Sequence, residues 1–260
     1  MGNLILKVHN LSFGYDVERT VLNNISFELY AGESLGIIGP NGSGKTTLLK
    51  LLTGILPIQA GTVELFAKPL DSYTKRDLAK LFAVVEQEGM REQAFTVEEI
   101  VTMGRYPWKK PLSSLTEYDY KIIEEAIRTF ELDEWRDKTV ANLSGGERQL
   151  VSLGRVMVQE PQILFLDEPT TYLDIGNQLL LMHHVRNWQQ EQDLTIMMVL
   201  HDLNLVAQYC DRLLLLNQAG VIAAMGTVAE VMTATNIEEA YGIKPIMIKH
   251  PATGVPQIIV

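Results

Sequence analysis

The stretch "GPNGSGKT" (residues 39–46) follows the apolar run "SLGIIG" (34–39) and precedes "TLLKLLTGIL" (47–56). Glycines allow backbone N–H groups to turn inward around phosphate oxygens, and the start of a helix adds partial positive charge. In such a loop Lys45 reaches the outer phosphates of a triphosphate and the Thr46 hydroxyl ligates Mg²⁺. A plain glycine-rich turn is the alternative, but a buried strand before the loop and a helix after it favour phosphate binding. The expected contacts are Gly39, Pro40, Asn41, Gly42, Ser43, Gly44, Lys45, Thr46 and Thr47.

The composition of the whole chain limits the possible functions. With 260 residues, of which 47% are apolar and 21% charged, the chain can bury the core of one large domain or of a domain with an inserted lobe. A formal net charge of −10 argues against a protein that grips nucleic acid through a broad basic face. The single cysteine, Cys210, excludes an intramolecular disulfide and is expected to be a small core residue.

The N-terminal stretch "MGNLILKVHN" has no basic segment followed by an apolar one, as a secretion signal would. Leu6 occupies the position where a myristoylation signal needs Ser or Thr. No run reaches the roughly 18 apolar residues that a membrane-spanning helix needs. We therefore expect a soluble chain whose role at a membrane would depend on a partner.

The order of strand and helix patterns indicates an α/β fold. Short strands are expected at 4–8, 24–29, 34–39 and 62–66, and helices from Thr96 to about Gln159. Thr96 with Glu99 has the spacing of a capping box, and Thr116 opens a second helix. The apolar runs "ILFL" (163–166) and "TIMMVL" (195–200), with a helix over 176–190 between them, predict parallel strands. A hairpin is expected to turn at 218–220.

Two carboxylates follow one of these strands. In "ILFLDEP" Asp167 and Glu168 lie at the carboxyl end of a buried strand, where open α/β sheets place their ligands. An acidic pair there is costly unless a cation compensates it, and Mg²⁺ would do so. We expect Asp167 to hold the metal and Glu168 to orient and polarise the attacking water.

The segment "LSGGERQ" (143–149) predicts a second anion-binding helix start. Ser144 with Glu147 has capping-box spacing, which by itself indicates only an ordinary helix cap. The two glycines that follow, Gly145 and Gly146, leave backbone N–H groups bare for a close phosphate. Because one nucleotide already has its own loop at 39–46, this helix is expected to face the nucleotide of a second copy of the chain.

With "GPNGSGKT", "LSGGERQ" and "ILFLDEP" in this order, the chain resembles the ATP-binding subunits of ABC transporters over nearly its full length. The resemblance implies a P-loop NTPase (RecA-like) core with an antiparallel β subdomain and an inserted α-helical subdomain. It implies one ATPase domain over 1–260, with its nucleotide-binding core in 1–87 and 160–260 and its helical subdomain in 88–159. The implied cofactors are ATP and Mg²⁺.

The resemblance also assigns roles to single residues. Tyr15 in "FGYD" stands where the family stacks an aromatic ring on adenine, although locally a core or turn tyrosine is an equal alternative. Gln87 matches the glutamine that contacts Mg²⁺ and relays the nucleotide state. Family members usually have proline before that glutamine, whereas this chain has Glu86, which leaves the shape of the loop open.

Two further residues match family motifs. Asp174 closes "TTYLD" (170–174), which matches a loop along the dimer interface, although by itself it reads as a helix cap. His201 ends the strand "TIMMVL" and matches the histidine that contacts the terminal phosphate. The alternative for His201 is an ordinary histidine at a strand end.

The resemblance implies the partners as well. Two copies would sandwich two ATP molecules and close on them. Separate membrane permease subunits would use this closing of the dimer, and a substrate-binding protein would act through those subunits. The chain would then lie at the cytoplasmic face of the cell membrane, with segment 88–108, which includes Met90, Phe95 and Tyr106, receiving the membrane subunit.

Several longer segments resemble importers of iron–siderophore complexes, haem or vitamin B12: "TVEEIVTMGRYPW", "DEPTTYLDIGNQ", "HDLNLVAQYCDRLLLL" and "HPATGVPQIIV". Molybdate importers of similar build remain open. A non-transport ABC ATPase is a second alternative, and a small-molecule kinase, which would leave "LSGGERQ" unexplained, is a third.

Overall fold

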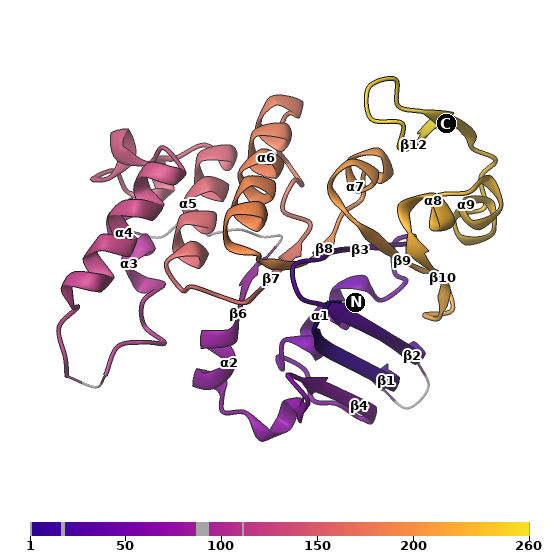
Figure 1. Ribbon diagram of the computed structural model, residues 1–260, viewed down its shortest axis with the longest axis horizontal. Coiled ribbons are helices and arrows are strands. Elements are labelled where there is room, and N and C mark those ends of the chain that lie inside the picture. Colours follow the sequence, from indigo (N-terminus) through magenta and orange to yellow (C-terminus); the bar gives the residue numbers. More distant parts are fainter. Residues whose placement is uncertain (1, 17–18, 87–93, 111, 260) are drawn as a thin grey trace. The chain divides into compact units, whose positions relative to one another are not determined.

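The computed structural model describes residues 2–16, 19–86, 94–110 and 112–259 (Figure 1). The chain forms two compact units, the first made of Met1–Tyr73 with Asp193–Val260 and the second of Thr74–Gln192. The predicted helical subdomain, 88–159, falls within the residue range of the second unit. No helix in the described ranges combines the length and the apolarity needed to cross a bilayer.

The first unit contains an antiparallel sheet in the order β2-β1-β4-β5. Its strands are β1 (Leu4–Gly14), β2 (Thr20–Tyr30), β4 (Ala60–Leu65) and the short β5 (Lys68–Pro69), which leads into a 3-10 turn at Leu70–Ser72. Leu6 pairs with Leu29 of β2 and with Leu65 of β4, and all three are buried. The alternation of apolar residues therefore gives this sheet one core-facing side, as an antiparallel sheet allows.

Four further strands of the first unit lie in the order β10-β9-β3-β8. They are β3 (Ser34–Ile38), β8 (Thr195–Val199), β9 (Arg212–Leu216) and β10 (Ile222–Thr227). Every residue of β3 and β8 is buried, which explains their uninterrupted apolar sequences. Strands β8 and β9 both run parallel to β3, and β10 returns antiparallel to β9 as the expected hairpin.

Helices and a terminal hairpin complete the first unit. The helices are α1 (Lys45–Leu52), α7 (Leu203–Tyr209), α8 (Val228–Val231) and α9 (Ala234–Tyr241). Strands β11 (Ile246–Lys249) and β12 (Pro256–Ile259) form the hairpin. The Asn204 side chain on α7 holds it, because its amide donates to the Ile258 carbonyl at 3.0 Å and accepts from the Ile258 N–H at 2.7 Å.

The second unit is mainly helical. It contains α2 (Lys75–Leu81), α3 (Val97–Met103), α4 (Glu117–Thr129), α5 (Gly145–Met157) and α6 (Ile175–Gln192), with 3-10 turns at Asp133–Trp135 and Val140–Asn142. Strands β6 (Phe82–Val85) and β7 (Ile163–Asp167) pair in parallel. The predicted capping boxes at Thr96 and Ser144 are confirmed, and Thr116 forms a third with Asp119.

Arg105 connects the helices of the second unit, and only 3% of it is exposed. Its Nε donates to Asp119 Oδ1 at 2.7 Å, and its Nη1 donates to the Val158 carbonyl at 2.7 Å and to Glu160 Oε2 at 2.6 Å. Burial raises the pKa of Asp119, but hydrogen bonds from Thr116 and Arg105 outweigh it, so the pKa is lowered overall. The guanidinium thus joins the chain after α3 to the start of α4 and the end of α5.

We expect Arg105→Ala to destabilise the second unit by about 3 kcal/mol, because it takes the buried donor away from two carboxylates and a carbonyl. All three tryptophans, Trp108, Trp135 and Trp188, belong to this unit, so the urea midpoint of tryptophan fluorescence measures it. Arg128→Ala, at an exposed position on α4, serves as the control and should change stability by less than about 0.5 kcal/mol. An unchanged midpoint in Arg105→Ala would contradict this role.

Candidate nucleotide-binding site

The predicted phosphate loop connects β3 to α1 in the first unit and turns through glycines with positive φ. The φ values are 151° at Gly39, 82° at Gly42 and 96° at Gly44. A Cβ at Gly39 would lie 2.4 Å from the Leu216 carbonyl oxygen, and one at Gly44 would lie 2.7 Å from Leu22 Cδ2. At Gly42 a Cβ would meet nothing within 4 Å. Close packing therefore requires glycine at the two ends of the loop, whereas Gly42 lies at its open side.

The polar groups of this loop fit an anion. Lys45 is 5% exposed, and its Nζ donates to the carbonyls of Gly39 at 2.8 Å and Pro40 at 3.1 Å. Helix α1 has Gly44 at its N-cap and no capping side chain, so its first N–H groups have no side-chain acceptor at the cap. The buried Ser43 Oγ has no hydrogen-bond partner among the described residues. An uncapped helix start beside a held ammonium suits phosphate oxygens.

Tyr15 follows β1 and lies at the surface, with 60% of the residue exposed. Its ring stands edge-on to Phe13, with the centroids 5.1 Å apart, and its hydroxyl lies 3.3 Å from Thr47 Oγ1 on α1. Tyr15 is therefore not a core residue. Its contact with Thr47 places the ring next to the helix that follows the phosphate loop, where it is available for stacking.

Two other residues of the first unit lie near this loop. His201 is exposed and follows β8, and because β8 is a parallel neighbour of β3, His201 and the loop lie at the same edge of the strands. Tyr241, at the end of α9, has its pKa raised to about 12 by burial, while a hydrogen bond with the backbone of Gly39 acts in the opposite direction. Sequence reasoning missed Tyr241, since nothing in its local sequence relates it to a loop some 200 residues earlier.

The predicted carboxylates end β7 in the second unit. Asp167 and Glu168 are each 7% exposed. Glu168 has a φ of 51°, so the chain turns sharply after the strand. The Thr171 N–H donates to the Glu168 carbonyl at 3.2 Å, and the Thr171 hydroxyl lies 3.3 Å from Glu168 Oε2 and donates to it. This turn holds the Glu168 carboxylate at the carboxyl end of the strand.

The start of α5 is capped and exposed. The Ser144 N–H donates to Glu147 Oε2 at 2.6 Å, and the Glu147 N–H donates to Ser144 Oγ at 3.3 Å. The two glycines have different surroundings. A Cβ at Gly145 would have only Leu173 Cδ2 nearby, at 3.9 Å, whereas one at Gly146 would lie 2.9 Å from Cγ of Asn177. The first glycine thus faces open space, and the second packs against a side chain.

Asp174 is the N-terminal cap of α6. Its Oδ1 accepts from the Asn177 N–H and its Oδ2 from the Asn177 side-chain amide, both at 2.8 Å. Tyr172, in the loop before it, is 90% exposed, and Ile175 after it is 77% exposed. The capping interpretation of Asp174 is thus present in the structure, and it leaves the exposed loop beside it available to a partner.

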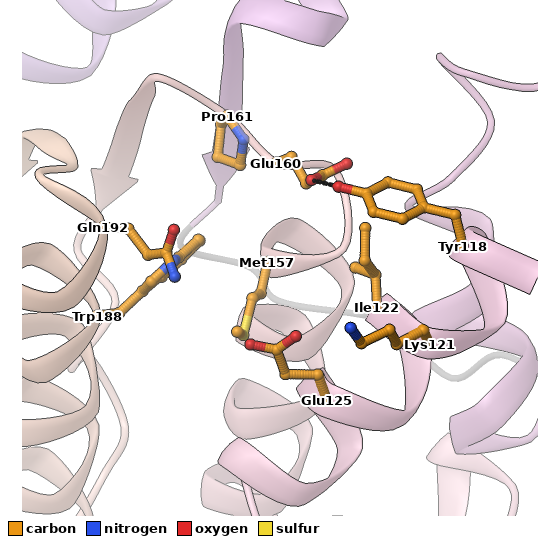
Figure 2. A pocket seen from close by; sticks show the side chains of 9 residues that line it. All are labelled: Tyr118, Lys121, Ile122, Glu125, Met157, Glu160, Pro161, Trp188 and Gln192. Carbon is orange, nitrogen blue, oxygen red and sulfur yellow. Dashed lines mark hydrogen bonds between the residues drawn. The ribbon is translucent and has the colours of Figure 1, made fainter.

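One predicted site residue lies outside the described part of the chain, and the second unit contains a cavity that the predicted site does not use. Gln87 lies outside the described residues, and Glu86 before it is exposed. Among the described residues no group of three or more His, Cys, Asp or Glu side chains could hold a metal ion. A cavity of about 310 Å³ lies in the second unit. Its lining includes Tyr118 of α4, Met157 of α5 and Trp188 of α6 (Figure 2). None of the predicted site residues lines it.

Comparisons with known proteins agree on one family. Residues 22–171 match the ABC transporter family. The chain is 39% identical over 256 residues to the uncharacterized ABC transporter ATP-binding protein YvrA of Bacillus subtilis (strain 168), covering 98% of this chain but only 58% of that relative. It is 38% identical over 258 residues to the hemin import ATP-binding protein HmuV of Thermobifida fusca (strain YX), covering 99% and 89%.

A solved structure is similar over the whole chain. It shows an ABC transporter assigned to the metal-chelate type, in an inward-facing conformation, with 27% sequence identity and a TM-score of 0.84. The match covers 99% of this chain and 97% of the solved one. The mixed α/β fold with its antiparallel sheet and its helical part is therefore that of an ATP-binding cassette.

Because Gly39 is closely packed and Gly42 faces open space, replacing each of them by alanine should have different effects. Gly39→Ala should destabilise the first unit by on the order of 3 kcal/mol and abolish ATP binding, because both the backbone conformation and the Leu216 carbonyl oppose a side chain. Gly42→Ala should cost only about 1 kcal/mol, since it meets strain but no neighbour. Urea unfolding and titration with a fluorescent ATP analogue measure both effects. Equal losses in the two variants would contradict the packing argument.

Proposed function

The chain belongs to the ABC transporter family, and we propose that it is the ATP-hydrolysing subunit of an importer for a metal chelate, such as an iron–siderophore complex, haem or vitamin B12. Proteins of this family bind ATP and hydrolyse it to power transport. The observation that carries the proposal is the loop between β3 and α1, in which an uncapped helix start, a buried ammonium and the glycine turn fit phosphate groups.

In this proposal the first unit holds the nucleotide. The exposed ring of Tyr15 stacks on the adenine, and the N–H groups of 39–47 with Lys45 bind the phosphates. When bound, Mg²⁺ neutralises charge that develops on the phosphates during transfer. Thr46, Asp167 and Gln87 are the residues that would hold it.

Glu168 is the proposed general base. It orients a water molecule and accepts its proton as the water oxygen bonds to the terminal phosphorus and the bond to the bridging oxygen of ADP breaks. The turn with Thr171 supports this role, because it keeps the carboxylate at the strand end in a largely buried place. His201 would contact the terminal phosphate.

A second copy of the chain completes each site in this proposal. Ser144, Gly145 and Gly146 would face the phosphates held by the partner's loop, and Asp174 would lie along the same interface. The exposed start of α5 supports this, because a helix of 13 residues directs its N–H groups and its dipole toward an anion there. ATP binding would close the pair, and hydrolysis with product release would open it.

The proposed machine also needs membrane subunits. We assign their docking to the segment 88–108, because Phe95 and Tyr106 are 46% and 63% exposed, while Met90 lies outside the described residues. A substrate-binding protein would act through these subunits, and the chain would work at the cytoplasmic face of the membrane. The hemin-importing relative and the metal-chelate type structure support the substrate class.

Glu168→Gln should bind Mg·ATP as tightly as the parent chain and hydrolyse it about 10²–10⁴-fold more slowly, because the amide cannot accept the proton from water. Phosphate release under single-turnover conditions measures the step. Glu191→Gln makes the same change at an exposed position on α6 and should leave the rate unchanged.

Lys45→Ala provides the contrast, because it should weaken ATP binding itself by removing the ammonium from the phosphates. Slower hydrolysis in Glu168→Gln and weaker ATP binding in Lys45→Ala would together support a catalytic role for Glu168 and a binding role for Lys45. A Glu168→Gln variant that hydrolyses ATP at the parent rate would contradict it.

A further inference from the structure

The Asn177 side chain on α6 contacts two segments that the proposed function places at the interface between two copies. Its amide donates to Asp174 Oδ2 at 2.8 Å, at the end of the 170–174 loop. It also lies against the backbone of Gly146, where a Cβ would come within 2.9 to 3.1 Å of its Cγ, Oδ1 and Nδ2 atoms. Asn177 is therefore packed between the loop 170–174 and the first turn of α5.

Ordinary helix capping does not require this arrangement. The backbone N–H of Asn177 already donates to Asp174 Oδ1, which satisfies the cap of α6. The Asn177 side-chain amide donates a second hydrogen bond to the same carboxylate. The amide also packs against Gly146 in α5. Capping of α6 therefore does not explain why the Asn177 side chain contacts Gly146.

The contact also accounts for the second glycine of "LSGGERQ". Gly146 lies inside α5 without a positive φ, so it does not need the conformational freedom of glycine, and glycine in a helix is otherwise destabilising. Gly145 faces open space, whereas the missing Cβ of Gly146 leaves the room that the Asn177 amide occupies.

We propose that Asn177 is a positioning residue that ties the loop 170–174 to the phosphate-facing start of α5, so that both reach the second copy in one fixed arrangement. The inference rests on the proposed function for its consequence, but the tie itself belongs to a single chain. Without the tie, dimer closure must also order the two segments relative to each other. Because this ordering costs free energy, half-maximal dimer formation then needs a higher ATP concentration.

Asn177→Asp tests the tie, because it places two carboxylates where the amide now donates to Asp174 Oδ2. The first measurement is hydrogen exchange, in the chain without nucleotide, of the Glu147 and Arg148 N–H groups, which donate to the Ser144 hydroxyl and the Ser144 carbonyl. We expect exchange there to become about tenfold faster, the equivalent of one lost hydrogen bond. Asn187→Asp makes the same change at an exposed position of α6 and should have no effect.

The second measurement is the ATP concentration for half-maximal dimer formation in the Glu168→Gln background, followed by size-exclusion chromatography. Asn177→Asp should raise it about tenfold. The affinity of the single chain for a fluorescent ATP analogue should stay unchanged, because the phosphate loop is untouched. A merely structural defect would instead lower the thermal stability and the analogue affinity together.

Combining Asp174→Asn with Asn177→Asp exchanges donor and acceptor, and asparagine still caps a helix. This pair should recover slow exchange of the Glu147 and Arg148 N–H groups and part of the dimer formation. Unchanged exchange in Asn177→Asp, or no recovery in the exchanged pair, would overturn the tie. If exchange responds as expected but Glu168→Gln alone never dimerises with ATP, the tie stands and the proposed function fails.

Discussion

The tight turn of the backbone between β3 and α1 is the constraint on which the proposed nucleotide site depends. β3 is buried along its whole length, so its carboxyl end is fixed by its parallel neighbours β8 and β9. The chain then passes so close to the end of β9 that only glycine fits at position 39. Helix α1 then starts without a capping side chain, and Lys45 donates to the carbonyls of Gly39 and Pro40 in the turn. The fixed shape of the proposed phosphate-binding loop therefore follows from a packing requirement of the core.

In the second unit, polar side chains add directional contacts to an apolar core that includes Phe130, Val151 and Leu153. Arg105 joins the chain after α3 to α4 and the end of α5, and Asn177 joins α6 to the start of α5. Hydrogen bonds require particular distances and angles, so these contacts restrict how the helices can be placed relative to one another. Under the proposed function this precision matters, because the exposed start of α5 must meet a phosphate that another copy holds.

Features that are local in sequence were predictable, and features that join distant segments were not. The buried strands β3, β7 and β8 are largely apolar runs, and the caps at Thr96 and Ser144 follow from a Glu three residues later in each case. The contacts of Tyr241 with the phosphate loop and of Asn177 with Gly146 bridge 202 and 31 residues, and no local pattern marks them. The sequence suggested that both glycines of "LSGGERQ" leave N–H groups bare, whereas the structure shows a packing reason for the second.

In the proposed function two copies of the chain build each ATP site together, and molecular mass with a count of bound nucleotide tests this most directly. Light scattering of Glu168→Gln with Mg·ATP should give the mass of two chains holding two ATP molecules. Adding Ser144→Arg, which places a bulky cation at the exposed start of α5, should give one chain that still holds one ATP. A dimer that survives Ser144→Arg unchanged, or a Glu168→Gln variant that binds ATP and stays a single chain, would contradict this shared site.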